Sequence, residues 1–199
     1  MVKIPGETGD IFVKLHAALT GIIVSLLLIV VYPCIIISCY NNFSEYILCD
    51  FEAIEDLDRL GWECHSLLSL SHEHATHGAA SLKTEIFPTG SFRLMPWFDR
   101  HDWSIYKSLC FDVYNPSGED MHIYVRIEDR KIVHEYNDAY YDKVSLRPGL
   151  NHIDIPLKIL HTKNSSRKIS LEHIYRFYIT MFPPAKKTVL YFDYLRLLP

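Results

Sequence analysis

Two segments of the chain, residues 123–128 and 175–182, alternate between apolar side chains and side chains that can bind a polar ligand. A period of two is typical of β-strands, because successive side chains point to opposite faces of a sheet. With the apolar residues and Tyr175 turned toward a core, the outer residues are Tyr124, Arg126, Glu128, Arg176, Tyr178 and Thr180. If both strands share a sheet, one outer face carries two tyrosines, two arginines and a carboxylate.

This mixture of side chains is suited to sugar recognition. Flat aromatic faces pack on the C–H surface of a pyranose, and planar charged groups hydrogen-bond to paired hydroxyls. Tyr136, Tyr140 and Tyr141 belong to a segment expected beside this face. The alternative is a solvated face of cross-strand pairs, each worth about 0.2–1 kcal/mol, with any ligand held by loops around Trp97 and Phe98. The predicted ligand-binding residues are Tyr124, Arg126, Glu128, Tyr136, Arg176 and Tyr178.

Catalytic patterns are missing from the sequence. Residues 128–142 hold enough carboxylates for the pair that glycoside hydrolysis needs, but charged loops of any sandwich bring such pairs together by chance. The chain has no Gly-x-Ser-x-Gly, phosphate-binding glycine loop or His-Glu-x-x-His motif. Its net charge of −4 argues against a nucleic-acid partner, which requires a basic surface. We therefore predict a non-enzymatic protein.

Similar alternating segments predict about ten short strands at the spacing of a β-sandwich. They cover residues 46–52, 66–70, 80–86, 92–95, 109–114, 123–128, 135–143, 151–157, 175–182 and 189–197. Between the two central strands lies Asn-Pro-Ser-Gly at 115–118, where proline removes a backbone donor and glycine permits positive φ. The predicted class is all-β, a two-sheet sandwich.

The N-terminal part differs in composition, since residues 15–44 contain no Asp, Glu, Lys or Arg. About 20 apolar residues suffice to cross a bilayer as a helix. We predict one transmembrane signal anchor, which tethers the C-terminal domain outside the cytoplasm at the cell membrane. The predicted divisions are a cytoplasmic segment 1–16, the anchor 17–40, a linker with the start of the first strand 41–49, and the domain 50–199. The alternative is a lipoprotein signal ending at Cys39, because Ile-Ile-Ser-Cys at 36–39 resembles a lipobox.

The number and spacing of the cysteines and histidines predict no transition-metal site. The domain has an odd number of cysteines, Cys49, Cys64 and Cys110, and no Cys-x-x-Cys spacing, so we expect no obligatory disulfide framework. A closed zinc site needs four convergent ligands, and no acidic or thiol group completes the histidine cluster. That cluster consists of His65, His72, His74 and His77.

A series of short motifs runs through the domain. It comprises Asp-Phe-Glu at 50–52, Gly-Ala-Ala-Ser-Leu-Lys at 78–83, Asp-Trp-Ser at 102–104, Phe-Asp-Val-Tyr-Asn-Pro at 111–116, Pro-Gly-Leu-Asn at 148–151, Ile-Pro-Leu at 155–157 and Tyr-Phe-Asp-Tyr-Leu-Arg-Leu at 191–197. In this order it resembles jelly-roll carbohydrate-binding modules of the galactose-binding-like superfamily. It is similar in particular to domains appended to bacterial glycoside hydrolases and to complex I intermediate-associated domains. The resemblance covers residues 50–199 and implies a jelly roll, non-catalytic binding and often a structural calcium ion.

The resemblance also implies where calcium would bind. Glu52 and Asp193 match family positions that supply ligands, and backbone oxygens of residues 81–83 complete the expected set. The alternative is that both carboxylates are ordinary solvated charges at strand ends.

Two functions of different class follow. The first is a membrane-tethered carbohydrate-binding module for cell-surface or extracellular polysaccharide. The second is a structural or assembly protein that docks another envelope protein through the sandwich face. Aromatic residues on a polar face favour sugar, whereas an exposed aliphatic patch of several hundred Å² favours a protein partner.

Overall fold

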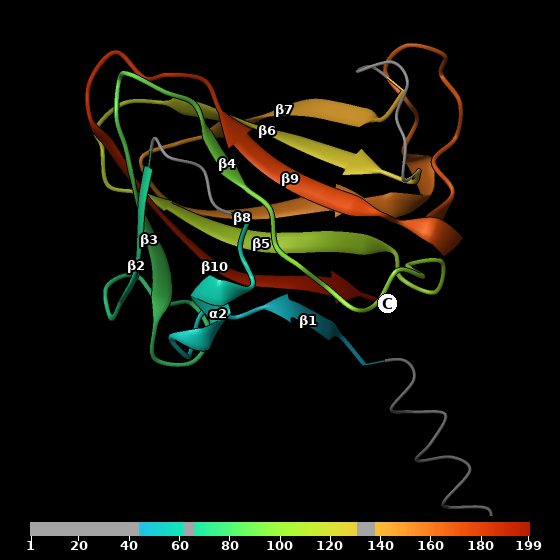
Figure 1. The fold of residues 1–199 in the computed structure, drawn as a ribbon, viewed down its shortest axis with the longest axis horizontal. Helices are drawn as coiled ribbons and strands as arrows, with labels where there is room; N and C mark the ends of the chain where they lie inside the picture. Colours follow the sequence, from blue (N-terminus) through green and yellow to red (C-terminus); the bar gives the residue numbers. More distant parts are fainter. Residues whose placement is uncertain (1–43, 62–65, 131–137) are drawn as a thin grey trace, which may run out of the picture. The chain divides into compact units, whose positions relative to one another are not determined.

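The computed structural model describes residues 44–61, 66–130 and 138–199 (Figure 1). The chain divides into two units, Met1–Ser44 and Glu45–Pro199. The predicted segment 1–16, the anchor 17–40 and Cys39 lie outside the described residues, so the anchor and the lipoprotein alternative stay predictions. Within the described ranges no helix has the length and apolar character needed to cross a membrane.

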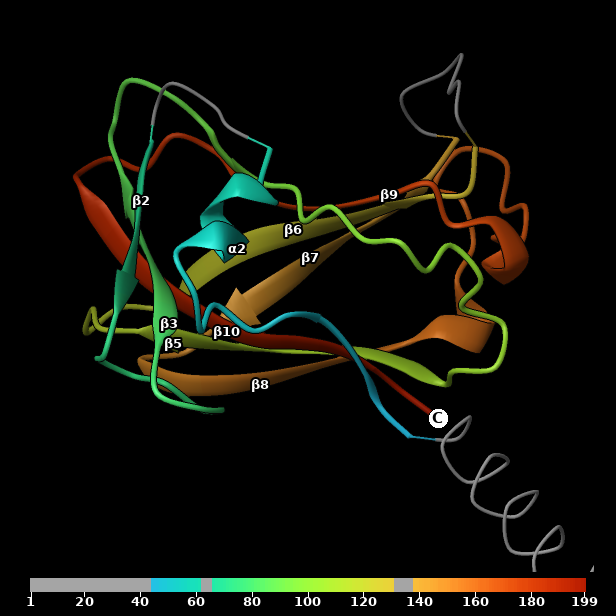
Figure 2. The ribbon, with the colours of Figure 1, turned by 60° about the horizontal axis from the view of Figure 1, so that its bottom comes forward.

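The second unit is a sandwich of two antiparallel sheets, as predicted (Figure 2). The six-stranded sheet has the order β2-β3-β10-β5-β8, with β1 also paired to β10. Its strands are β1 (Tyr46–Cys49), β2 (Ser66–Ser71), β3 (Ser81–Ile86), β5 (Ser108–Asn115), β8 (Gly149–Pro156) and β10 (Thr188–Leu198). The four-stranded sheet has the order β4-β9-β6-β7. It consists of β4 (Phe92–Leu94), β9 (Arg176–Met181), β6 (Met121–Glu128) and β7 (Tyr140–Leu146).

Helical structure is confined to three short turns among the described residues: α2 (Glu55–Asp58), η1 (Leu157–Ile159) and η2 (Leu171–His173). The largest shift in a strand boundary concerns residues 135–143, where β7 instead begins at Tyr140 and runs to Leu146.

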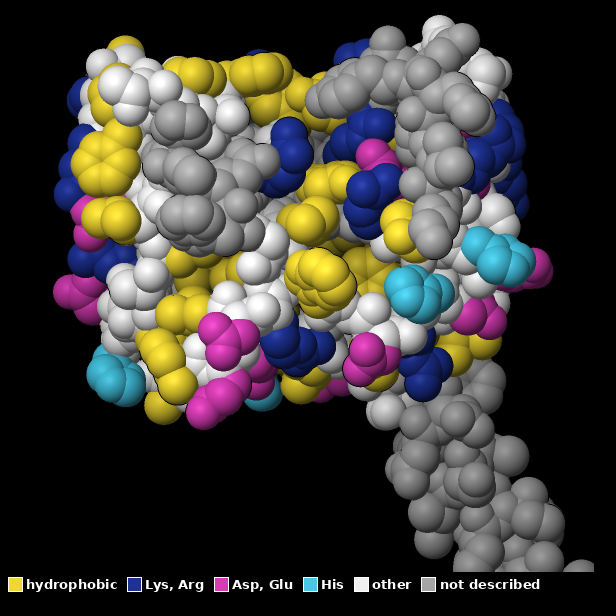
Figure 3. Space-filling view, viewed as in Figure 1, with side chains coloured by type: hydrophobic (Ala, Val, Ile, Leu, Met, Phe, Trp, Pro, Cys, Tyr) yellow, Lys and Arg dark blue, Asp and Glu magenta, His cyan; other side chains and the backbone are white. Residues whose placement is uncertain are grey.

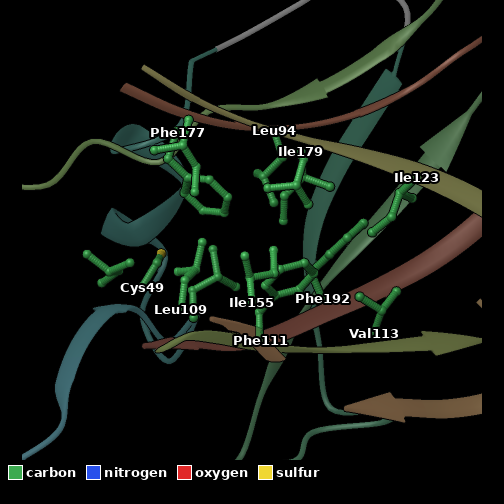
Figure 4. Packing of buried hydrophobic residues seen from close by; sticks show 14 of the residues in the cluster. Cys49, Leu94, Leu109, Phe111, Val113, Ile123, Ile155, Phe177, Ile179 and Phe192 are labelled. Carbon is green, nitrogen blue, oxygen red and sulfur yellow. The ribbon is translucent and has the colours of Figure 1, made fainter. Parts of the chain in front are cut away.

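The core lies between the two sheets (Figure 4). Phe111 and Phe192 of the six-stranded sheet face Phe177 and Ile179 of the four-stranded sheet, and all four side chains are fully buried. Burying a large apolar side chain stabilises the fold by about 1.5–3 kcal/mol relative to exposure. The alternating apolar residues therefore fix which face of each strand turns inward.

The turn after β5 carries the chain from one sheet to the other. The Asn115 side chain accepts the Ser117 amide at 3.0 Å and donates to the Glu119 carbonyl at 2.9 Å. An Asn side chain that bonds the backbone two residues on is a stable turn in its own right. The Asn-Pro-Ser-Gly sequence thus separates β5 and β6 as predicted, and the two strands belong to different sheets.

An ion pair between the buried Asp129, which directly follows β6, and the partly exposed Arg167 holds the segment after β6. Arg167 donates two hydrogen bonds to Asp129, at 2.6 and 2.9 Å, and also contacts Asp138 at 3.1 Å. The Ser170 amide donates to Asp129 at 2.8 Å. Burial by itself raises the pKa of Asp129, but the bonds from Arg167 and Ser170 outweigh it and hold the pKa below its ordinary value.

We expect Arg167→Met to lower the free energy of unfolding by about 3 kcal/mol, because Asp129 is left buried without its cation. Since the folded-state pKa of Asp129 is depressed, its contribution is present above the unfolded value of about 3.9 and is lost as pH falls through the folded value. Urea unfolding at neutral and acidic pH measures both effects. Lys168→Met, at an exposed neighbouring position, is the control and should stay within about 0.5 kcal/mol of wild type. An equal loss in both variants would contradict this account.

Candidate functional site

The outer face of the four-stranded sheet brings together most of the predicted ligand-binding residues. Strands β6 and β9 are neighbours, and their register sets Arg126 opposite Tyr178 and Glu128 opposite Arg176. Because directly opposed residues on antiparallel strands point to the same side, all four side chains share this face. Figure 3 shows a face of the molecule on which basic, acidic and hydrophobic side chains lie side by side.

A recess of about 120 Å³ opens on this sheet. It is lined by Arg93, Arg126, Glu128, Tyr141, Tyr178 and Thr180. We call it the sheet recess. Arg93 was not among the predicted residues, although it lies between the buried Phe92 and Leu94, an alternation that turns it outward.

The carboxylate of Glu128 is held between two guanidinium groups. Its Oε1 accepts a hydrogen bond from Arg126 Nε at 2.7 Å, and its Oε2 lies 2.9 Å from Arg176 Nε. Only 6% of the Glu128 side chain is exposed. Two cations on a buried carboxylate offset its loss of hydration and fix its orientation. The site therefore presents planar charged groups in one geometry.

Aromatic side chains border the charged cluster. Tyr124 stacks on Tyr141, with ring centroids 5.4 Å apart and planes 10° apart, and Phe182 meets Tyr124 edge-on at 5.0 Å. Burial raises the pKa of Tyr178, so its hydroxyl is protonated at neutral pH and can donate a hydrogen bond. The guanidinium of Arg93 lies 5.4 Å from the centre of the Tyr178 ring.

The remaining predicted aromatic residues have different positions. Tyr140 packs against the core on the opposite side of β7 from Tyr141, so it does not extend the face. Tyr136 lies outside the described residues. Tyr175, predicted to point inward, is instead exposed and precedes β9, because its amide donates to the Glu128 carbonyl at 2.7 Å before the strand begins.

The two carboxylates expected to bind calcium are occupied by the loop that precedes β3. Asp193 Oδ2 accepts the amides of Thr76 and His77 at 2.6 and 3.0 Å, and Oδ1 accepts the amide of Tyr194 at 2.7 Å. Glu52 Oε1 accepts the amides of Ala79 and Ala80, both at 2.9 Å.

These donors do not fit a calcium ion. Calcium is bound by oxygen lone pairs, whereas here amide hydrogens point at the oxygens that would have to face the metal. The loop is also close: a Cβ at Gly78 would lie 2.3 Å from Glu52 Cδ. Burial raises the pKa of Asp193, and the three amides together with the Thr76 hydroxyl offset this rise only in part. Glu52 and Asp193 thus anchor the loop directly.

His65 of the predicted cluster lies outside the described residues, and the histidines of this loop do not converge either. His72 Nδ1 lies 2.9 Å from the Ala79 carbonyl, His74 stacks on Tyr114, and His77 Nδ1 lies 2.8 Å from Asp50. Across the described residues, no three His, Cys, Asp or Glu side chains form a group that could hold a metal ion. The described free cysteines, Cys49 and Cys110, are buried.

Comparison with known proteins supports the fold. No family model matches the chain, and no curated protein matches it. The structure is similar to the family 11 carbohydrate-binding module from Clostridium thermocellum in complex with a β-1,3-1,4-mixed-linked tetrasaccharide, with a TM-score of 0.59 and 15% identity, over 77% of this chain and 95% of that one. It is also similar to the agarase AgWH50C, with a TM-score of 0.60 and 13% identity, over 76% of this chain but 26% of the agarase. The chain therefore has the jelly-roll fold of carbohydrate-binding modules.

We expect thermal unfolding to have the same midpoint, within about 1 °C, in millimolar calcium chloride and in excess EDTA. A calcium ion at a free concentration of about 100 times its dissociation constant would add about 2.7 kcal/mol to the free energy of unfolding. The midpoint would then rise by several degrees. Asp193→Asn should lower the midpoint equally in both media, because an amide group cannot accept all the backbone donors and leaves some unpaired, at about 1–3 kcal/mol. A midpoint that rises with calcium in the wild type and not in the variant would restore the metal site.

Proposed function

We propose that residues 50–199 form a non-catalytic carbohydrate-binding module that binds polysaccharide on the outer face of the four-stranded sheet. The observation that carries this proposal is the oriented cluster of Glu128 between Arg126 and Arg176, bordered by stacked tyrosines. Such a surface offers hydrogen-bonding partners for paired hydroxyls and flat rings for the apolar side of a pyranose. The fold, shared with a family 11 module whose structure contains a tetrasaccharide, supports the same function.

A non-catalytic role agrees with the composition of the sheet recess. Glycoside hydrolysis uses two carboxyl groups about 5–9.5 Å apart. Among the described residues that line the recess, Glu128 is the one carboxylate, and both its oxygens already face guanidinium groups. Its geometry suits a fixed hydrogen-bonding partner better than a proton donor.

Docking of another envelope protein has less support. The exposed aliphatic side chains of the described residues lie on separate elements and connections, among them Ile54, Leu67, Ile105, Leu150 and Ile159. Single exposed apolar residues are normal on a protein surface, whereas a stable partner requires a continuous patch.

We expect Tyr124→Ala and Tyr141→Ala each to weaken oligosaccharide binding about tenfold, or about 1.4 kcal/mol, because each removes one ring of the stacked pair. Titration calorimetry with a β-1,3-1,4-mixed-linked tetrasaccharide and with agaro-oligosaccharides, after a glycan-array survey, measures the loss. The matched control is Tyr114→Ala, a half-buried tyrosine in a stacked pair on the other sheet. Binding that survives both sheet variants, or falls equally in the control, would place the site elsewhere.

We further propose that residues 17–40 tether this module to the cell membrane with residues 50–199 outside the cytoplasm. The support is the uncharged stretch 15–44, long enough to cross a bilayer.

The full chain should sediment with membranes and resist extraction by alkaline carbonate, and a protease added outside intact cells should cleave the module. Cys39→Ser distinguishes the two forms of anchor: membrane association that is unchanged indicates the helix, and its loss indicates lipidation. Full-length chain in the soluble fraction would exclude both.

A further inference from the structure

A second, larger recess lies next to the sheet recess. It has a volume of about 440 Å³ and is lined mainly by the connection between β4 and β5 and by the start of β9. Its principal side chains are Trp97, Phe98, Asp99, His101, Tyr175 and Arg176. We call it the Trp97 recess. Trp97 is 66% exposed, the second-largest exposed fraction among the large apolar side chains of the described residues after Ile159.

The exposed indole is carried by a fixed backbone. The Trp97 amide donates to the Arg59 carbonyl at 2.8 Å, and Arg59 Nη2 donates back to the Trp97 carbonyl at 3.2 Å. An isolated β-bridge joins Leu60 to Pro96 next to it. Keeping a tryptophan ring in solvent on a rigid backbone costs a monomer free energy. The arrangement is typical of a ligand-binding surface, because little conformational entropy is lost when the ligand binds.

Polar groups surround the aromatic surface. His101 Nδ1 lies 2.7 Å from the Ile174 carbonyl; since a carbonyl only accepts, Nδ1 carries the proton. In the neutral ring Nε2 is then an acceptor for a hydroxyl. Asp99 and Arg176 add a carboxylate and a guanidinium to the lining. The Trp97 recess therefore combines apolar rings with hydrogen-bonding groups, as the sheet recess does.

The two recesses meet at the start of β9. Arg176 lines the Trp97 recess while its Nε lies 2.9 Å from Glu128 in the sheet recess. The Tyr175 amide donates to the Glu128 carbonyl at 2.7 Å. The Cα atoms of residues two apart on a strand are about 7 Å apart. Arg176 in the Trp97 recess and Tyr178 in the sheet recess are two apart on β9, so the two recesses lie close together along this strand.

We propose that the Trp97 recess is a second sugar subsite, which takes further pyranose units of the same glycan chain that occupies the sheet recess. This inference rests on the proposed function. At about 120 Å³ the sheet recess is below the range of about 300–1,000 Å³ usual for ligand pockets, whereas the Trp97 recess falls within it. The sheet recess supplies oriented polar contacts, and the Trp97 recess supplies most of the apolar contact area.

A length series of ligands tests the second subsite. The probes are β-1,3-1,4-linked gluco-oligosaccharides and agaro-oligosaccharides of two to six units, titrated against the full-length chain in detergent. Trp97→Ala and Tyr175→Ala should weaken binding of the six-unit ligand about tenfold and that of the two-unit ligand less than about twofold. Leu67→Ala, at an apolar residue on β2 that is 59% exposed, is the control and should change neither. Thermal unfolding checks that each variant is folded.

The outcomes separate this inference from the proposed function. Equal binding of the six-unit ligand by wild type and Trp97→Ala, together with a loss in Tyr124→Ala, overturns the second subsite and leaves the sheet recess as the whole site. An equal loss for short and long ligands also overturns it, because Trp97 would then belong to a single site. Failure of the wild type to bind either series overturns both proposals.

Discussion

The register of β6 against β9 is the constraint on which the outer face of the four-stranded sheet depends. It sets Glu128 opposite Arg176 and Arg126 opposite Tyr178. A slip of one residue on β6 would turn Arg126 and Glu128 into the core and Ile127 toward solvent. Unpaired buried ions cost several kcal/mol each, so the apolar alternation that builds the core also fixes which residues lie on the opposite face.

The ion cluster on this face does more for orientation than for stability. Glu128 and Arg126 are almost fully buried and have lost most of their hydration, which cancels most of the Coulomb attraction between these two groups. What remains is geometry, because the carboxylate contacts one guanidinium at each oxygen. Groups already held in position bind a ligand with a smaller loss of conformational entropy. A costly cluster at the surface of a sheet is thus better explained by recognition than by folding.

The sequence predicted the strand faces well because local alternation and burial agree. Ile123, Val125 and Ile127 are all fully buried, as their period of two requires. Tyr175 was placed on the wrong side because the strand begins one residue later, and its position depends on a hydrogen bond to a distant carbonyl, which no local pattern reveals. The contacts of Glu52 and Asp193 were equally hidden, since they join residues 27 and 117 positions apart.

The loop before β3 shows how far similarity of fold extends to function. Gly78 has φ of +61°, which lets the backbone approach Glu52 where a side chain would collide. The strand ends thus fix where the carboxylates lie, but the conformation of the loop determines whether backbone amides or an ion contacts them. The outer residues of β6 and β9 have the same freedom, because the core does not constrain them. At 15% identity the architecture is shared with the family 11 module, while the side chains of the outer face and the loops are this chain's own.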